Sequence, residues 1–237
     1  DNPGFDKQDS QYLGLNLDLK LNEKIASDVS VTSVTSDIDY GYDEDWTFTG
    51  FHVAGYNATD QYRRDVTTTT VDLRLLSLPG EGLAAGAIDW VFGLYSLDRE
   101  VDLTRTYTYL TNNFVSDFDV ERLAIYGELS GDVATDLRLS IGLRVEEHSA
   151  EYSDSEGIFF SPDDDLVGGR LLLEKTTTNE NLIYASLTRG YKSGGFNTSG
   201  TLDADLRLYD PETLWNLELG YKGRLLSDRL GLRAALF

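Results

Sequence analysis

Cysteine and methionine are both absent from this chain of 237 residues, and histidine occurs only twice. Without cysteine the chain has no disulfide, no thiolate metal site and no cysteine nucleophile. The two histidines, His52 and His148, lie far apart in the sequence and lack metal-ligand spacing. No Ser/His/Asp arrangement stands out either. We therefore predict no metal site, no cofactor and no catalytic residue, and we expect that the protein is not an enzyme.

Long apolar runs are also missing, because no stretch of about 18 apolar residues occurs in the sequence. This excludes a transmembrane helix. A transmembrane β-barrel stays open, since each of its strands needs only about 9–11 residues of alternating hydropathy. The first residue is not methionine, no signal peptide is present, and a strand pattern still runs at Phe237. We therefore expect the chain to be part of a longer protein.

Basic residues are scarce, with 20 Lys and Arg against 41 Asp and Glu and a formal net charge of −21. Such a charge argues against nucleic acid as a partner, because nucleic-acid-binding proteins carry basic patches. Solubility alone would also account for the acidity. The acidic runs at 43–45 and 163–165 could hold calcium, but they lack the spacing of a calcium loop. We interpret them as solvated loop charge.

What the sequence has in abundance is period-two alternation, which sorts side chains onto the two faces of a strand. We predict an all-β fold, an antiparallel up-and-down meander of about ten strands. The strands are expected near residues 12–21, 25–35, 65–77, 88–98, 120–130, 137–145, 167–175 and 182–190, with a final hairpin that turns at 226–228.

The predicted connections alternate in length along the chain. Five are short, near residues 22–24, 79–87, 131–136, 176–181 and 225–228, and the four between them are about 15 residues or longer. In an antiparallel meander, alternate connections lie at opposite ends of the strands. One rim then carries turns and the other carries long loops, as in outer-membrane barrels. A soluble sandwich has no reason to separate its loops in this way.

The two faces of the predicted strands differ in polarity. Three apolar sets are expected to face lipid: Leu13, Leu15, Leu17, Leu19 and Leu21; Leu137, Leu139, Ile141, Leu143 and Val145; and Trp215, Leu217 and Leu219. Arg138, Arg144, Glu218 and Lys222 are expected to face a wet lumen, because charges are rarely buried without partners. The alternative is an apolar face packed on a second sheet. Repetition over ten strands with segregated loops favours the membrane barrel.

Two segments carry a resemblance to a known family. They read LIYASLTRGYKSGGFN at 182–197 and DPETLWNLELGYK at 210–222, and VTSVTSDIDYGYDEDW at 31–46 adds a third match. These segments resemble the barrel of TonB-dependent outer-membrane receptors, of the type that takes up iron complexes. The matching residues are Tyr184, Ala185, Ser186, Arg189, Gly190, Tyr191, Lys192, Gly194, Gly195, Phe196 and Asn197, then Asp210 through Asn216, Glu218, Gly220 and Lys222.

The resemblance implies a closed barrel of about 22 strands with an N-terminal plug domain. Residues 1–237 would then be one partial barrel domain, with the plug and the C-terminal strands outside it. Family members import ferric siderophores, cobalamin, haem or glycans across the Gram-negative outer membrane. An inner-membrane TonB complex powers them through an N-terminal box. We expect active import of a scarce nutrient, with a ferric siderophore or other iron complex as the first candidate ligand and outer-membrane lipid as the surroundings. The alternatives are a passive porin or structural barrel and a soluble acidic β-sandwich that binds calcium or carbohydrate.

Five residues are candidates for holding or guiding a ligand: Arg144, Glu146, Tyr191, Lys192 and Asn216. Tyr191 and Lys192 lie where a predicted strand meets its long loop, a position where binding groups collect. The alternative is that such luminal side chains pair with each other or with a plug.

Overall fold

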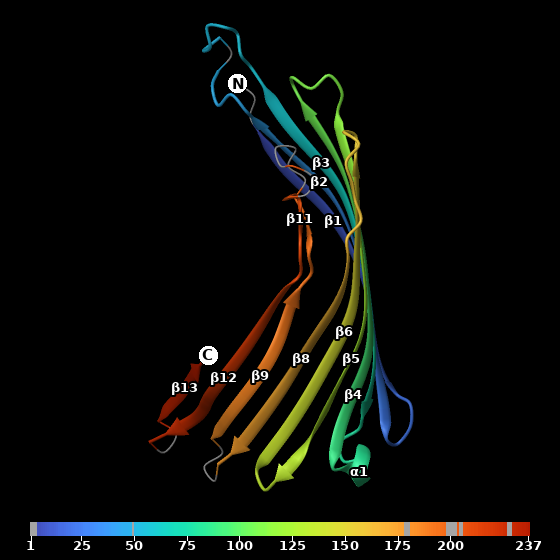
Figure 1. Cartoon of the computed structure of the whole chain (residues 1–237), viewed down its shortest axis with the longest axis vertical. Helices are drawn as coiled ribbons and strands as arrows, with labels where there is room; N and C mark the ends of the chain where they lie inside the picture. Colours follow the sequence, from blue (N-terminus) through green and yellow to red (C-terminus); the bar gives the residue numbers. More distant parts are fainter. Residues whose placement is uncertain (1–3, 49, 178–180, 198–202, 204–205, 227–228) are drawn as a thin grey trace.

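The chain forms one tall, curved antiparallel sheet (Figure 1). The computed structural model describes residues 4–48, 50–177, 181–197, 203, 206–226 and 229–237. Its elements in order are β1 (Phe5–Lys20), β2 (Ile25–Asp43), β3 (Thr59–Ser77), α1 (Leu83–Gly86), β4 (Ile88–Tyr107), β5 (Phe114–Ala134), β6 (Leu137–Asp154), β7 (Phe159–Phe160), β8 (Asp163–Thr176), β9 (Leu182–Lys192), β10 (Gly195–Phe196), β11 (Leu208–Tyr209), β12 (Glu212–Leu225) and β13 (Leu230–Leu236).

The strand order confirms the predicted meander. The main path runs β1-β2-β3-β4-β5-β6-β8-β9-β12-β13, and β7 pairs with β6 while β10 and β11 form a separate small sheet. Every neighbouring pair on the path is antiparallel. Over the described residues no helix is long and apolar enough to cross a membrane.

Alternate connections lie at opposite ends of the strands, as predicted. The turn rim carries the connections at 21–24, 78–87 and 135–136, and the loop rim carries those at 44–58, 108–113 and 155–162 together with the segment between β9 and β12. The predicted length of the loops is only partly right. Residues 44–58 form a long loop, whereas the connection at 108–113 is short.

The strands extend further toward the loop rim than the sequence predicts. About half of the stretch 36–64 is strand, because β2 continues to Asp43 and β3 begins at Thr59. The acidic run at 163–165 opens β8 and is not a loop. The reason is visible in β4, where the outward side chains change from Trp90 and Phe92 to Asp98 and Glu100 while the pairing with β3 and β5 continues. The strand therefore continues, with side chains still alternating between the two faces, beyond the point where the outward side chains stop being apolar.

An apolar band covers the outward face. The register places Leu129, Ile141, Leu171, Leu187 and Leu217 in one row across five neighbouring strands, and all five side chains are exposed. The predicted lipid-facing sets lie in this band, with Leu137 and Leu139 half-buried and the others exposed. Within the described residues no second sheet covers the band, so the sandwich alternative loses its basis.

The inward face is polar and holds the predicted luminal charges. The Arg138 guanidinium lies 2.6 Å from the Asp89 carboxylate. The Tyr184 hydroxyl donates to Glu218 at 2.5 Å, and the Lys222 ammonium lies 4.9 Å from the centroid of the same ring. The Tyr184 ring lies next to Gly220, where an added Cβ would stand 2.1 Å from the ring. Inward tyrosines therefore bridge neighbouring strands where a glycine leaves space.

Candidate ligand-binding site

Three of the five predicted binding residues meet on the inward face. The Arg144 Nε donates to Glu146 Oε2 at 2.9 Å and to the Tyr191 hydroxyl at 3.0 Å. Tyr191 in turn donates to Glu146 Oε2 at 3.1 Å. The guanidinium also lies 4.8 Å from the centroid of the Tyr95 ring, a distance at which a cation is attracted to the ring face. We call this the Arg144 network.

The other two predicted residues lie outside the Arg144 network. Lys192 is the exposed last residue of β9, opposite Glu212. Asn216 is half-buried in β12, opposite Thr188. The structure thus brings Arg144, Glu146 and Tyr191 together and leaves Lys192 and Asn216 apart. The ligand-binding role of all five stays a prediction.

A cavity of about 1140 Å³ opens on the inward face near the loop rim. Its wall is formed by the loop-side halves of β3, β4, β5 and β6, and residues 193–196 and Tyr209 cover part of it. None of the five predicted residues lines it. The volume exceeds the range of about 300–1,000 Å³ typical of small-molecule sites, so the cavity has room for a bulky ligand.

Four arginines line this cavity: Arg64, Arg99, Arg105 and Arg122. They come from three adjacent strands, and each faces inward, because its register partner on a neighbouring strand also lines the cavity. Glu156 is the one acidic side chain among the described lining residues. In a chain with a net charge of −21, the cavity therefore concentrates positive charge.

Aromatic rings close one side of the cavity. The Phe196 ring of β10 stacks on Phe160 at 5.1 Å and lies 5.1 Å from Tyr152 and 5.6 Å from Phe118. The amide of Gly194 donates to the Asp164 carboxylate at 2.8 Å. These contacts anchor the segment that carries Phe196 against the sheet wall. Aromatic side chains therefore flank the arginines.

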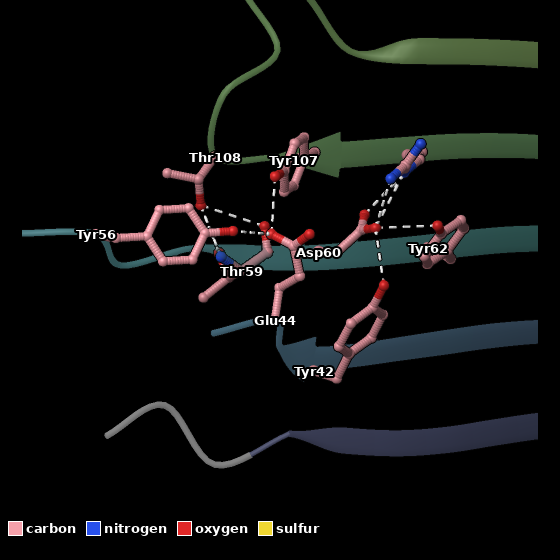
Figure 2. A network of polar contacts seen from close by, with 9 residues as sticks. Tyr42, Glu44, Tyr56, Thr59, Asp60, Tyr62, Tyr107 and Thr108 are labelled. Carbon is pink, nitrogen blue, oxygen red and sulfur yellow. Dashed lines mark hydrogen bonds and ion pairs between the residues drawn. The ribbon is translucent and has the colours of Figure 1, made fainter. Parts of the chain in front are cut away.

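The Arg105 guanidinium is held in place by a buried carboxylate (Figure 2). Asp60 is 1% exposed and accepts from Arg105 Nε at 2.9 Å and from a second guanidinium nitrogen at 2.6 Å. Tyr62 and Tyr42 donate to the same carboxylate at 3.0 and 3.2 Å. Figure 2 shows Tyr42, Asp60 and Tyr62 converging from β2 and β3. We call this the Asp60 network.

A second set of contacts fixes the long loop 44–58 beside the cavity. Tyr56 and Tyr107 donate to the Glu44 carboxylate at 2.8 and 2.7 Å (Figure 2). The hydrogen bond to Glu44 raises the pKa of the Tyr56 hydroxyl. Hydrogen bonds from the Thr47 side chain and then from the Ala58 amide lower the pKa of the Asp45 carboxyl. The loop is thus tied at both ends to the strands below it.

Two cavity-lining side chains carry buried polar atoms without a hydrogen-bond partner among the described residues. These atoms are Nδ1 of His148, a residue that is 4% exposed, and Nε of Arg122. Arg122 also lies 3.9 Å from Glu146 and so connects the cavity to the Arg144 network. Buried polar atoms are almost always partnered, so these two are candidates for contact with a ligand. Over the described residues no group of three or more acidic or histidine side chains could hold a metal ion.

An antiparallel, curved strand wall with an apolar outward band, its longest loop on one rim and a polar cavity inside is typical of an outer-membrane β-barrel protein. The chain matches the family model described as "TonB dependent receptor-like, beta-barrel" over residues 1–237. It therefore belongs to the TonB-dependent receptors, a family of transporters in the Gram-negative outer membrane. The predicted family, fold class and location are confirmed.

Individual relatives share this architecture. The pesticin receptor of Yersinia enterocolitica is 28% identical over 163 residues, which cover 65% of this chain and 24% of that protein. The solved ferric yersiniabactin uptake receptor FyuA of Yersinia pestis has a TM-score of 0.72 at 22% identity and covers 96% of this chain and 34% of its own. The ferric citrate transporter FecA has a TM-score of 0.73 at 12% identity, over 91% of this chain and 32% of its own.

The likeness to these structures shows the fold alone. The copper transporter OprC has the same fold, with a TM-score of 0.69 at 16% identity over 95% of this chain and 38% of its own. The chain spans about a quarter of the length of its curated relatives and about a third of the solved ones.

Proposed function

We propose that the full-length receptor imports a scarce nutrient across the outer membrane, and that the nutrient is an iron complex of the ferric siderophore type. The observation that carries this proposal is the cavity of about 1140 Å³ at the loop rim, where a ligand arriving from outside first meets the lumen. Its size and its guanidinium groups suit a large chelate. The ferric yersiniabactin uptake receptor and the ferric citrate transporter, which share this fold, are named for ferric complexes, and this supports the same ligand class.

The proposal includes the architecture around this chain. Residues 1–237 form one part of a closed barrel of about 22 strands, with a plug domain in its lumen and further strands completing the wall. An N-terminal box couples the receptor to the TonB energy-coupling complex. Outer-membrane lipid surrounds the apolar band.

Within this scheme the Arg144 network lies deeper in the lumen than the cavity, and Arg144, Glu146, Tyr191, Lys192 and Asn216 guide the ligand inward. The ion pair between Arg122 and Glu146 supports this order, because it joins the cavity to the network. Alanine substitution at each of the five positions tests the idea by ligand affinity and uptake rate. Unchanged values at all five would remove them from the transport path.

The transport proposal is tested by deleting the gene and growing cells under iron limitation. We expect the deletion to lower uptake of radioactive iron from at least one chelate, and the plasmid-borne gene to restore it. Collapse of the proton gradient should abolish the same uptake in cells that carry the gene. Uptake that survives this collapse would indicate a passive porin. Iron uptake that is unchanged for every chelate tried would refute the iron proposal while leaving the barrel in place.

A further inference from the structure

We propose that the cavity selects an iron complex of net negative charge whose chelating groups are aromatic rings, and that Arg64 and Arg99 set this preference. The inference rests on the proposed function and narrows it from iron complexes in general to the polyanionic catecholate class. A bare metal ion is a poor occupant, because the described residues offer no cluster of ligands for it.

The four arginines of the cavity have different environments. Asp60 neutralises Arg105, and Glu146 lies 3.9 Å from Arg122. Arg64 and Arg99 form no ion pair with any described residue, although 41 acidic side chains are present in the chain. Arg99 is exposed and Arg64 is half-buried, so both stay hydrated while the cavity is empty, and their unpaired positive charges attract an anion into it. A neutral complex would leave both charges uncompensated, whereas an anionic complex pairs with them.

The cavity is also lined by aromatic rings. Tyr62, Phe118, Tyr152, Phe196 and Tyr209 all face the cavity. The Phe196 ring stacks on Phe160 with an interplanar angle of 19°. Aromatic pairs add about 0.5–1.5 kcal/mol beyond their buried area. Arginine stacks on ring faces and forms paired hydrogen bonds to oxygen anions, so catecholate rings satisfy both kinds of lining residue.

Buried atoms without partners supply an independent indication of a ligand. Arg122 Nε and His148 Nδ1 line the cavity and lack hydrogen-bond partners among the described residues. His148 is more than nine-tenths buried. The Arg122 nitrogen can only donate, so its missing partner is an acceptor. Catecholate oxygens are acceptors of this kind.

The chain offers a matched control for the arginine test. Arg63 and Arg64 are neighbours in β3 with opposite orientations. Arg64 lines the cavity, whereas Arg63 lies on the other face, where it is exposed and 3.8 Å from Asp65. Arg63→Gln and Arg64→Gln therefore remove the same charge a few ångströms apart along the chain, on the outer and inner sides of the wall.

The experiment uses the full-length receptor in detergent and three probes. One is the trianionic iron(III) complex of a tripodal tris-catechol chelator, the second is the neutral iron(III) complex of a matched tris-hydroxamate, and the third is an anionic iron(III) citrate complex without rings. Affinities are measured by equilibrium dialysis with radioactive iron. We expect the tris-catecholate to bind at least about tenfold more tightly than either other probe. Arg64→Gln and Arg99→Gln should each lower that affinity about tenfold, with no loss for Arg63→Gln or for the neutral probe. Correct folding of each variant is checked by its heat-modifiable migration on a gel.

Three results would overturn the inference: equal affinity for the anionic and neutral complexes, equal loss in Arg63→Gln and Arg64→Gln, or no binding of the tris-catecholate. Equal affinity for iron citrate and tris-catecholate would remove the aromatic part. These failures are distinguishable from failure of the proposed function, because the deletion strain reports iron uptake from every chelate. Binding of the neutral complex together with iron uptake would leave the transport proposal standing.

Discussion

The Asp60 network allows a sharp test of what holds the loop rim together. Asp60→Asn keeps the shape of the side chain but removes the charge that Arg105 faces. The wild-type carboxylate is buried and receives two guanidinium hydrogen bonds at 2.9 and 2.6 Å, in addition to the hydroxyls of Tyr62 and Tyr42. The substitution therefore breaks a paired, charge-assisted contact. It also replaces an oxygen that accepts hydrogen bonds by an NH2 group that donates them.

The size of the effect follows from the burial of the two partners. Removing one member of a fully buried ion pair costs about 3–5 kcal/mol. The Arg105 side chain is 35% exposed and can recover part of its hydration. We therefore expect Asp60→Asn to lower the free energy of unfolding by about 2–3 kcal/mol. The neighbouring outward carboxylate Asp65 is 49% exposed and lies 3.8 Å from Arg63, so Asp65→Asn should cost less than about 1 kcal/mol.

The assay is denaturant unfolding of the full-length receptor in lipid vesicles, with both variants compared under identical conditions. A double-mutant cycle with Arg105→Gln should show a coupling free energy above about 1 kcal/mol for the Asp60 pair. Equal destabilisation by Asp60→Asn and Asp65→Asn, or a coupling free energy near zero, would refute the reasoning. Either result would mean that the Asp60 network forms as a consequence of strand pairing and adds no stability of its own.

Two further predictions concern the sheet itself. Leu187→Arg places a charge on the lipid side of the apolar row and should cost about 2–4 kcal/mol of folding free energy in bilayers, whereas Thr188→Arg, its neighbour on the luminal side, should cost less; equal losses would contradict the assigned faces. Gly220→Ala drives a methyl group into the Tyr184 ring, which an added Cβ would approach to 2.1 Å, and should cost about 1–3 kcal/mol. The double variant with Tyr184→Ala should recover part of that loss, and a free energy of unfolding unchanged by Gly220→Ala would show that the ring moves aside freely.

The membrane-facing half of the fold could be predicted from the sequence. Around Ile141 and Leu143 every second side chain faces lipid and must be apolar. The hydropathy pattern therefore indicates directly which side chains point outward. Where the strands continue past the band, both faces are wet and the contrast disappears. Asp98 and Glu100 on the outside then look no different from a solvated loop, which is why the predicted strands end too early.

The arginine-lined cavity could not be predicted from the sequence, for the same reason and for a second one. Arg64 and Arg99 lie in the stretches that were expected to be loop or near a strand end, so no face could be assigned to them. Their closeness to Arg122 depends on the register of three strands, which period-two alternation does not specify. Extending the period of two along the strand from the apolar Trp90 and Phe92 would have placed Arg99 on the opposite, inward face. The Arg144 network was within reach because Arg144 and Glu146 follow directly on a clearly alternating strand.

The extension of the strands past the apolar band explains how one thin wall can present opposite charges on its two sides. In β4, Arg99 faces the cavity while Asp98 and Glu100 face outward, and in β5 Arg122 faces inward next to the outward Glu121. The outward carboxylates Asp98, Glu100 and Glu121 line a common hollow. An anion near the rim is therefore repelled by the outer surface and attracted by the lumen, and charge patterns of this kind raise association rates when the charges are focused in a recess. Loops alone could not maintain this arrangement, because it needs the strict inward and outward alternation of paired strands. Strand pairing beyond the apolar band, which the hydropathy pattern does not indicate, therefore places the arginines in the cavity.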